Sequence, residues 1–484
     1  MKVLRNYLYN IGYQILNMII PLITGPYTAR VLGPTGIGIN TYTFAIVQYF
    51  VLIGGLGIAL YGNREIAYVK GNTEKMSLTF WEIQIIKIIT VTLAYISFII
   101  YLIFTKKYQF YLALLSLYIL AAGFDISWLY EGLENFKITF TRNTLVRLVS
   151  FILIILLVKT KADLPIYIII LALSNLIGYV AMWPSIGKII TTVQFKKLNI
   201  AKHLKGISAL FIPYITLNIY PLINKTLLEH FIGVDSSGFY EKSDVIIRMA
   251  LTFVTSVSMV LLPHAANAFS KSGIESVKKI LYKAFCLTSL IAFPLATGIA
   301  AIAPKFGIFF YGKGFEPVGG AMFIEAFAIV FMGWSSIVGN QYLIPTNQIN
   351  SYTHSVLFGS ILNIVIDIPL IKIWGLNGAA MATVLSEAAI AFYQLLIIRK
   401  QVKLLTWGID LIKYGFASLI MFVIVYNISQ HYILNTLMFI MEVSLGIVIY
   451  LILILIIKPT GTRDIISFFK KISNSILRYG RSED

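Results

Sequence analysis

The stretch LNMIIPLITGPYTARVLGPTGIGINTYTFAI at residues 16–46 decides the fold of this chain. It contains the end of one apolar run, a short glycine-rich segment and the start of a second apolar run. About 20 mostly apolar residues in a helix cross the roughly 30 Å hydrocarbon core of a bilayer. The stretch therefore predicts two membrane helices, near 8–29 and 36–61, that are joined by a short loop.

The same pattern extends over the whole chain. Hydrophobic residues make up 58% of the 484 residues, charged residues only 12%, and the mean hydropathy is +0.83, so the sequence is too apolar for a typical soluble domain. Short alternating strands, which a membrane barrel requires, are missing from the pattern. We predict an all-α polytopic membrane protein of about fourteen spans, near 8–29, 36–61, 80–104, 108–130, 140–158, 164–186, 206–226, 244–264, 284–303, 318–342, 350–371, 376–398, 410–428 and 435–457.

The positive charges predict the orientation. If the N-terminus is cytoplasmic, 27 of the 39 Lys and Arg residues lie in segments on the cytoplasmic side and 10 lie in segments on the other side. This bias agrees with the positive-inside rule and places both termini in the cytoplasm. The net charge of +18 is thus explained by topology, and we expect no nucleic-acid partner.

An internal repeat appears when the chain is shifted by 200 residues. Pro21 then lies over Pro221, and Gly33 and Gly38 of VLGPTGIG at 31–38 lie over Gly233 and Gly238 of FIGVDSSG at 231–238. A unit of six spans enters the membrane in the same direction each time, so the repeat predicts two parallel six-helix lobes. The expected domains are an N-lobe at 1–187, a basic cytoplasmic linker at 188–205, a C-lobe at 206–400, and two further helices with a basic tail at 401–484.

Two motifs make the resemblance to a known family specific. ITGPYTARVLGPTGIGINTYTFAI at 23–46 and GGLGIALYGNREIA at 54–67 resemble the Wzx-type oligosaccharide flippases of the MOP superfamily. The resemblance implies two lobes in a V around a central cavity, which the first, second, seventh and eighth helices line. It also implies a lipid-diphosphate-linked sugar repeat unit as cargo, which is flipped for cell-surface polysaccharide such as capsule, exopolysaccharide or O-antigen.

Candidate cargo-binding residues are cations and amides on helices that would line such a cavity. Arg248 lies near the centre of its span, where a cation costs roughly 3 kcal/mol and usually faces a cavity or a partner. Asp244, one turn earlier, is the partner in the structural alternative. For the other cations the alternative is snorkelling to the interface, and for the amides it is hydrogen bonding between helices. The proposed set is Arg30, Lys225, Arg248, Asn17, Asn40 and Asn218.

Charged residues that could gate or couple transport form a second set. Arg64 and Glu65 end the second span, and a role in gating competes there with simple interfacial placement. Carboxylates within spans can bind Na+ or relay protons, so either ion is a candidate coupling ion. Lys87 is interpreted as an interfacial anchor. The gating and coupling candidates are Arg64, Glu65, Asp125, Asp244, Glu325 and Asp367.

Competing functions are weighed by what the sequence contains. A GxxxxGK[ST] motif is missing, and the five histidines have no metal-ligand spacing, so we expect no ATPase, no metal site and no cofactor. A glycan polymerase or glycosyltransferase would need a sizeable external loop, and the longest predicted one, at 226–243, is small. A cation-coupled multidrug antiporter of the same superfamily is the main alternative. We expect a transporter rather than an enzyme, in the bacterial cytoplasmic membrane, with membrane lipids around it and polysaccharide polymerases as partners.

Overall fold

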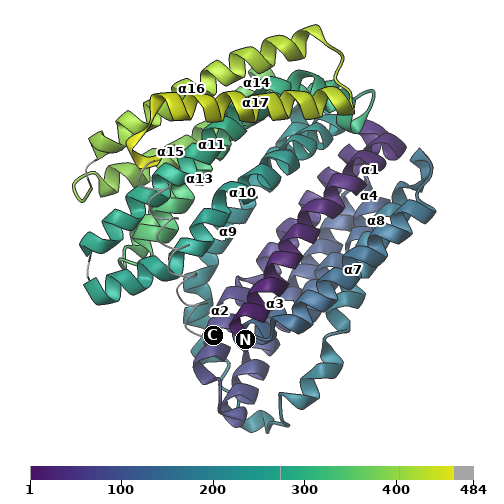
Figure 1. Ribbon diagram of the computed structural model, residues 1–484. Helices are drawn as coiled ribbons and strands as arrows, with labels where there is room; N and C mark the ends of the chain where they lie inside the picture. Colours follow the sequence, from purple (N-terminus) through teal and green to yellow (C-terminus); the bar gives the residue numbers. More distant parts are fainter. Residues whose placement is uncertain (1, 273, 403, 463–484) are drawn as a thin grey trace, which may run out of the picture. The chain divides into compact units, whose positions relative to one another are not determined.

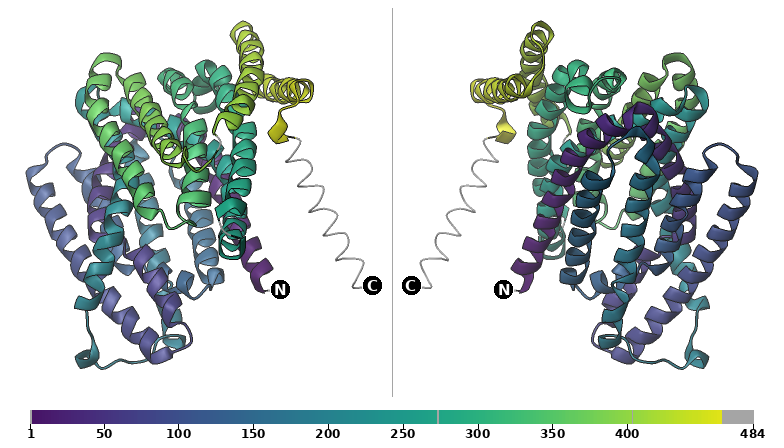
Figure 2. Two further views of the ribbon diagram at one scale, coloured as in Figure 1. Left: turned by 90° about the vertical axis from the view of Figure 1, so that its left-hand side faces the viewer. Right: turned by 90° about the vertical axis from the view of Figure 1, so that its right-hand side faces the viewer.

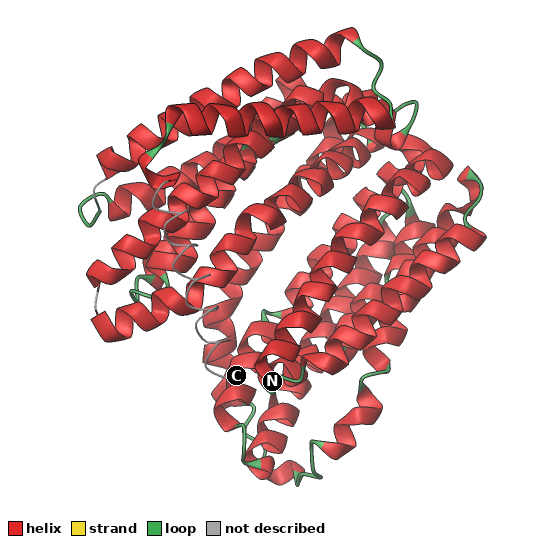
Figure 3. Cartoon of the chain, viewed as in Figure 1, coloured by secondary structure: helices red, strands yellow, loops and turns green. Residues whose placement is uncertain are grey.

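The computed structural model describes residues 2–272, 274–402 and 404–462. Within these ranges the structure describes the side chains as well as the backbone, except at 2–18, 195, 213, 217, 257–272, 274, 276, 279 and 404–406, where it describes the backbone alone. Two compact units are present, Met1–Gly238 (unit 1) and Phe239–Asp484 (unit 2). Figure 3 shows that helices account for nearly all of the drawn chain, and no described residue lies in a strand.

Unit 1 contains nine helices and the start of a tenth among its described residues (Figure 1). Short 3-10 turns follow α7 and α8, at Lys161–Asp163, Trp183–Lys188 and Phe195–Lys197. Apolar side chains from α2, α3, α6 and the chain after α8 form a buried cluster that includes Phe80 and Trp128. The helices are α1 (Lys2–Gly55), α2 (Ile58–Val69), α3 (Thr73–Phe104), α4 (Gln109–Leu115), α5 (Leu117–Phe124), α6 (Ser127–Gly132), α7 (Phe136–Leu157), α8 (Leu164–Val180), α9 (Ala201–Phe231) and the beginning of α10 (Val234–Ser272).

Helix α1 is bent rather than interrupted by a loop. Gly33 has φ 71° and ψ 176°, a conformation that glycine adopts readily because it has no Cβ, and Pro34 follows it. Figure 2 shows α1 running up from its N-terminal end and turning over at the far end. The glycine-rich loop that the sequence predicts here is therefore a sharp kink within helix.

Unit 2 has the same all-helical construction. A π-helix at Gly339–Leu343 follows α13, and Pro294 and Pro304 lie inside α11. The most extensive packing is between α14 and α15 and between α11 and α16. The helices are the rest of α10, α11 (Ile274–Tyr311), α12 (Glu316–Glu325), α13 (Ala328–Val338), α14 (Ile349–Trp374), α15 (Leu376–Ile398), α16 (Leu404–His431) and α17 (Thr436–Ile457).

The helices match the predicted membrane segments. In the described part of the chain, ten helices are long and apolar enough to cross a membrane, or twelve if each of two bent pairs is one span. One of the ten, Ile19–Val69, has 51 residues, so at 1.5 Å per residue it exceeds two hydrocarbon thicknesses and the kink at Gly33 divides it into two passes. The fourteen predicted segments are mostly helical, with interruptions inside four of them at 56–57, 116, 125–126, 181–182 and 326–327, and the chain is a multi-pass, all-α membrane protein.

The predicted loop at 226–243 is wrong. Helix α9 continues to Phe231, and α10 begins at Val234, so only two residues connect them. Hydrophobicity ends near Lys225, but the helices extend further because Glu229 is held by Lys107 and the hydroxyl of Ser237 bonds to the Lys225 carbonyl. The lobe boundaries predicted from the repeat remain a prediction.

Candidate functional site

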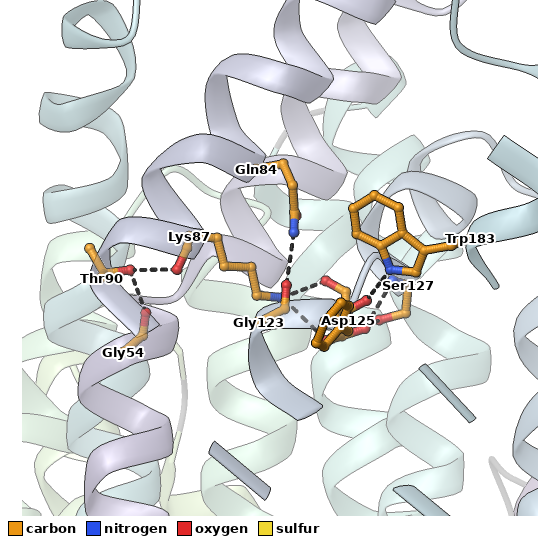
Figure 4. A network of polar contacts seen from close by, with 9 residues as sticks. Gly54, Gln84, Lys87, Thr90, Gly123, Asp125, Ser127 and Trp183 are labelled. Atoms are coloured by element: carbon orange, nitrogen blue, oxygen red, sulfur yellow. Dashed lines mark hydrogen bonds and ion pairs between the residues drawn. The ribbon is translucent and has the colours of Figure 1, made fainter. Parts of the chain in front are cut away.

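A buried ion pair lies where a membrane helix of unit 1 is broken. Between α5 and α6 the backbone of Asp125 is extended, with φ −70° and ψ 111°. The Lys87 ammonium, which is 4% exposed, donates to the Asp125 carbonyl at 2.6 Å and lies 3.5 Å from its carboxylate. Because a break in a membrane helix leaves backbone groups without partners, this cation satisfies a carbonyl that the helix has lost. Figure 4 shows Lys87 reaching across from α3 to the break.

Further hydrogen bonds fix the broken segment. The other carboxylate oxygen of Asp125 accepts from the backbone N–H and the hydroxyl of Ser127, at 2.9 and 2.6 Å. The indole of Trp183 donates to the Phe124 carbonyl at 2.8 Å, and the Gln84 amide donates to the Gly123 carbonyl at 2.8 Å. The break is thus held from three sides (Figure 4). Interpreting Lys87 as an interfacial anchor is wrong, because the side chain is buried inside the unit.

A second buried cluster joins the beginning of α9 to α2 and α3. His203, 3% exposed, shares a hydrogen bond of 2.8 Å with the Tyr61 hydroxyl and one of 2.9 Å with the Glu82 carboxylate. Glu82, 1% exposed, also binds Lys202 at 2.7 Å and accepts from the Asn199 N–H at 2.7 Å. The end of the predicted basic linker is therefore fastened to α3 rather than left as free chain.

The other end of α9 is attached to the same unit. Lys107, in the turn after α3, pairs with the buried carboxylate of Glu229, and donation to this carboxylate raises the pKa of Lys107. Three residues before Glu229, the Thr226 hydroxyl lies 2.9 Å from the Tyr49 hydroxyl. Helix α9 is consequently attached to the N-terminal helices of unit 1 near both of its ends.

Two glycines that the 200-residue repeat relates to each other are in direct contact. A Cβ on Gly38 would lie 2.2 Å from the Val234 carbonyl oxygen, and a Cβ on Gly238 would lie 2.8 Å from the Gly38 nitrogen. The two backbones approach closely because neither residue has a side chain. Gly233, before α10, has φ +133°, so both copies of the glycine-rich segment contain a glycine with positive φ.

In unit 2, charged groups of α10 and α12 form a further cluster. The Arg248 Nε donates to both carboxylate oxygens of Asp244, at 2.7 and 2.8 Å, so the pairing that the i, i+4 spacing allows is formed. Asp244 is 5% exposed and Arg248 is 42% exposed. Ser243 donates to Glu325 at 2.5 Å, and Glu325 interacts electrostatically with Asp244 and Arg248. The exposed Arg248 therefore interacts with two buried carboxylates, those of Asp244 and Glu325.

The remaining candidates are distributed over both units. Asn218 and Arg30 are exposed, Asn40 and Lys225 are half-buried, and the Asn218 amide donates to the Tyr214 carbonyl at 2.7 Å. Arg64 and Glu65 pair with each other at 3.1 Å on the surface of α2. Asp367 is fully buried in α14 with Asn363 one turn before it. The side chain of Asn17 lies outside the described residues.

Sequence reasoning missed two of these groups, although it noted both positions. Lys87 and Arg248 are the two basic residues that the charge count assigns to the interior of spans, and an ionisable residue at that depth is by default a functional candidate. His203 was counted only as a scattered histidine. His203 lies in a lysine-rich segment that is interpreted as a linker, and the contact with Glu82 of α3, 121 residues away, cannot be predicted from the sequence.

Comparisons with known proteins agree with this architecture. A candidate O-antigen transporter of Escherichia coli (strain K12) is 23% identical over 409 residues, which cover 82% of this chain and 96% of that protein. Among solved structures, the lipid II flippase MurJ in an inward closed conformation has a TM-score of 0.74 at 18% identity and covers 96% of this chain and 100% of its own. An inward-facing multidrug resistance transporter of the MATE family has a TM-score of 0.59 at 13% identity, with 82% and 94% covered.

These likenesses show that the chain shares its fold with MurJ and with a MATE transporter, which is described as a member of the MOP superfamily. A family model described as "Polysaccharide biosynthesis protein" matches residues 3–269. Since this match covers more than half of the 484 residues, the chain belongs to the polysaccharide biosynthesis protein family.

Proposed function

We propose that this protein flips polyprenyl-diphosphate-linked oligosaccharide repeat units across the bacterial cytoplasmic membrane by alternating access. Family membership over residues 3–269 is the observation that carries the proposal. A relative matched over 82% of this chain is named as a candidate O-antigen transporter, and a MurJ structure named as a lipid II flippase has the same fold. The cargo would supply cell-surface polysaccharide, and the protein would catalyse no covalent reaction.

The candidate cations Arg30, Lys225 and Arg248 have the chemistry needed to bind a diphosphate. Guanidinium groups bind phosphate oxygens through paired N–H donors, and lysines add charge. Arg30 and Arg248 are exposed in the protein, and Lys225 is half-buried, so each has a part of its side chain accessible. We propose that they attract the diphosphate while the amides of Asn17, Asn40 and Asn218 bind the sugar, with the polyprenyl tail in lipid.

Coupling and gating are assigned to the charged pairs. Arg64 and Glu65 would open or close the cytoplasmic end, and Asp125 would respond through its contact with Lys87. The buried carboxylates Asp244, Glu325 and Asp367 are the candidates for binding Na+ or exchanging H+. We place both termini in the cytoplasm, on the charge bias of the sequence, and expect polysaccharide polymerases to act on the flipped product.

Reconstitution tests the function directly. Liposomes that contain the full-length protein and a fluorescent lipid-linked oligosaccharide should move the label from the inner to the outer leaflet. Liposomes with the Arg248→Ala variant serve as a matched control for incorporation. Label movement at the same rate in protein-free liposomes would refute the proposal.

A cation-coupled multidrug antiporter is the second candidate, and the fold shared with a MATE transporter favours it. Such a protein would need exposed carboxylates to bind cationic drugs, whereas here Asp244 and Glu325 are buried under Arg248. Efflux of cationic dyes from the same liposomes, without movement of the lipid-linked oligosaccharide, would establish the antiporter instead.

A further inference from the structure

A groove of about 870 Å³ lies between α7 and α8 in unit 1. Two of the residues that line it, Leu145 and Ile177, are 56% and 63% exposed, so the groove is open along its side. Both helices are membrane spans, and the surroundings of such a side opening are therefore lipid. The groove is lined by Asn135, Lys137, Ile138, Thr141, Arg142, Leu145, Val146, Val149, Leu153, Ile169, Ile170, Leu173, Ser174, Ile177, Gly178, Ala181 and Met182.

The polar residues of the groove gather at one end. Asn135, Lys137, Thr141 and Arg142 all belong to the first two turns of α7 or to the residue before it. Beyond them the walls are apolar apart from Ser174, and none of the lining residues is acidic. The groove thus has a cationic, hydrogen-bonding end and an apolar length.

Arg142 is held in position at that end. Its guanidinium lies 3.9 Å from the centre of the Tyr179 ring, and its Nη1 donates to Asn143. Gly178 makes room for it, because a Cβ there would lie 2.9 Å from the Arg142 Nε. Among the residues that the structure describes, that Nε has no hydrogen-bond partner. The cation is therefore held between the Tyr179 ring and the Gly178 backbone, and no described carboxylate lies in the groove lining to neutralise it.

The beginning of α7 adds to the positive potential. The helix has no acidic residue in its first turn, and the side chain of the residue before it, Asn135, makes no cap hydrogen bond. Free N–H groups and the helix dipole both favour an anion at such an end. Glu134, the preceding acidic residue, is paired with Lys70 at 2.9 Å. The positive end of the α7 dipole, the Lys137 ammonium and the Arg142 guanidinium consequently all favour an anion at the polar end of the groove.

We propose that this groove binds an anionic phospholipid such as phosphatidylglycerol, with its phosphate at Lys137 and Arg142 and an acyl chain along the apolar walls. Basic pockets between membrane helices on the cytoplasmic side are suited to anionic headgroups. The apolar wall from Leu145 to Leu153 is about 12 Å long at 1.5 Å per residue, close to the roughly 15 Å of one leaflet. That length suits a phospholipid chain rather than the far longer polyprenyl tail of the cargo.

Native mass spectrometry of the full-length, delipidated protein tests the site, with phosphatidylglycerol and phosphatidylcholine as probes. The wild type should bind phosphatidylglycerol preferentially. Lys137→Gln and Arg142→Gln should each weaken that binding about fivefold, and the double variant should remove the preference. Lys188→Gln is the matched control, since Lys188 is an exposed cation that follows α8 but does not line the groove.

Three results would overturn the proposal: equal binding of both phospholipids by the wild type, unchanged preference in the double variant, or displacement of phosphatidylglycerol by polyprenyl phosphate at equal concentration. Leu173→Trp, which fills the apolar wall and leaves both cations in place, should reduce binding while the elution profile of the protein stays that of the wild type. If Leu173→Trp binds phosphatidylglycerol as well as the wild type does, the acyl chain does not occupy the groove. None of these outcomes depends on the cargo proposed above.

Discussion

The Lys87 ammonium lies 2.6 Å from the carbonyl oxygen of Asp125 and 3.5 Å from its carboxylate, although 38 residues separate them. The contact joins α3 to the break between α5 and α6. The buried Lys87 side chain therefore pairs with a half-buried carboxylate and replaces a lost helical hydrogen bond. Because Lys87 has both roles, we expect the folding stability of unit 1 to depend strongly on this one side chain.

Replacing Lys87 by Met should lower the free energy of unfolding by about 3–5 kcal/mol, because it leaves the Asp125 carboxylate without its cation. Asp125→Asn should have an effect of similar size, since it leaves Lys87 buried and unpaired. The double variant Lys87→Met with Asp125→Asn should be more stable than either single variant. Thermal unfolding in detergent, followed by size-exclusion chromatography, measures the order. A double variant less stable than both singles would contradict this account of the pair.

Gly38→Ala should reduce transport severely. The added Cβ would lie 2.2 Å from the Val234 carbonyl, so the chain after α9 must move away from α1. Gly55→Ala is a control on the same helix, because a Cβ there meets nothing within 4 Å. The liposome assay compares the two variants. Equal transport by both would show that the close approach of Gly38 is unnecessary.

His203→Ala should loosen the attachment of α9 at a cost of about 1–3 kcal/mol, since the Tyr61 hydroxyl loses its buried partner and Glu82 loses one of its donors. Amide hydrogen exchange at residues 199–210 should become faster. Lys205→Ala changes an exposed cation on the same helix and should leave the exchange rate unaltered. The interpretation fails if the two variants exchange alike.

Arg248→Ala should abolish glycan export in cells at normal expression. Loss of Arg248 also strips Asp244 of its paired donor, so the variant alone does not separate cargo binding from charge pairing. In Arg248→Ala with Asp244→Asn, no buried carboxylate remains at position 244 to be neutralised. We expect the double variant to remain inactive, because the cation itself is required. Restored export would assign Arg248 a purely structural role.

The course of the helices could be predicted from the sequence, because hydrophobic length alone determines where a chain crosses a bilayer. Most residues of the fourteen segments lie in helix, and the Asp244–Arg248 contact follows from their spacing of four residues. Contacts between distant segments could not be predicted in this way. Lys87 meets Asp125 only because α3 packs against α5. The break at Asp125 is preceded by Gly123, but glycine is common inside membrane helices and does not by itself predict a break.

The predicted loop at 226–243 shows a second limit. Charged residues such as Glu229 and Glu241 end the apolar pattern, yet the helices persist on both sides of Gly233. Hydropathy registers the loss of apolar residues but not the partners, such as Lys107, that make polar helix ends stable. The roles of the candidate cations remain predictions.

The contact between Gly38 and Gly238 has a consequence for how such a protein can change. The predicted repeat relates the two residues; a Cβ on Gly238 would meet the Gly38 backbone, and a Cβ on Gly38 would meet Val234, one turn before Gly238. A larger residue at either position would therefore force the beginning of α10 away from α1. Evolution can enlarge neither glycine without a compensating shift of one backbone against the other.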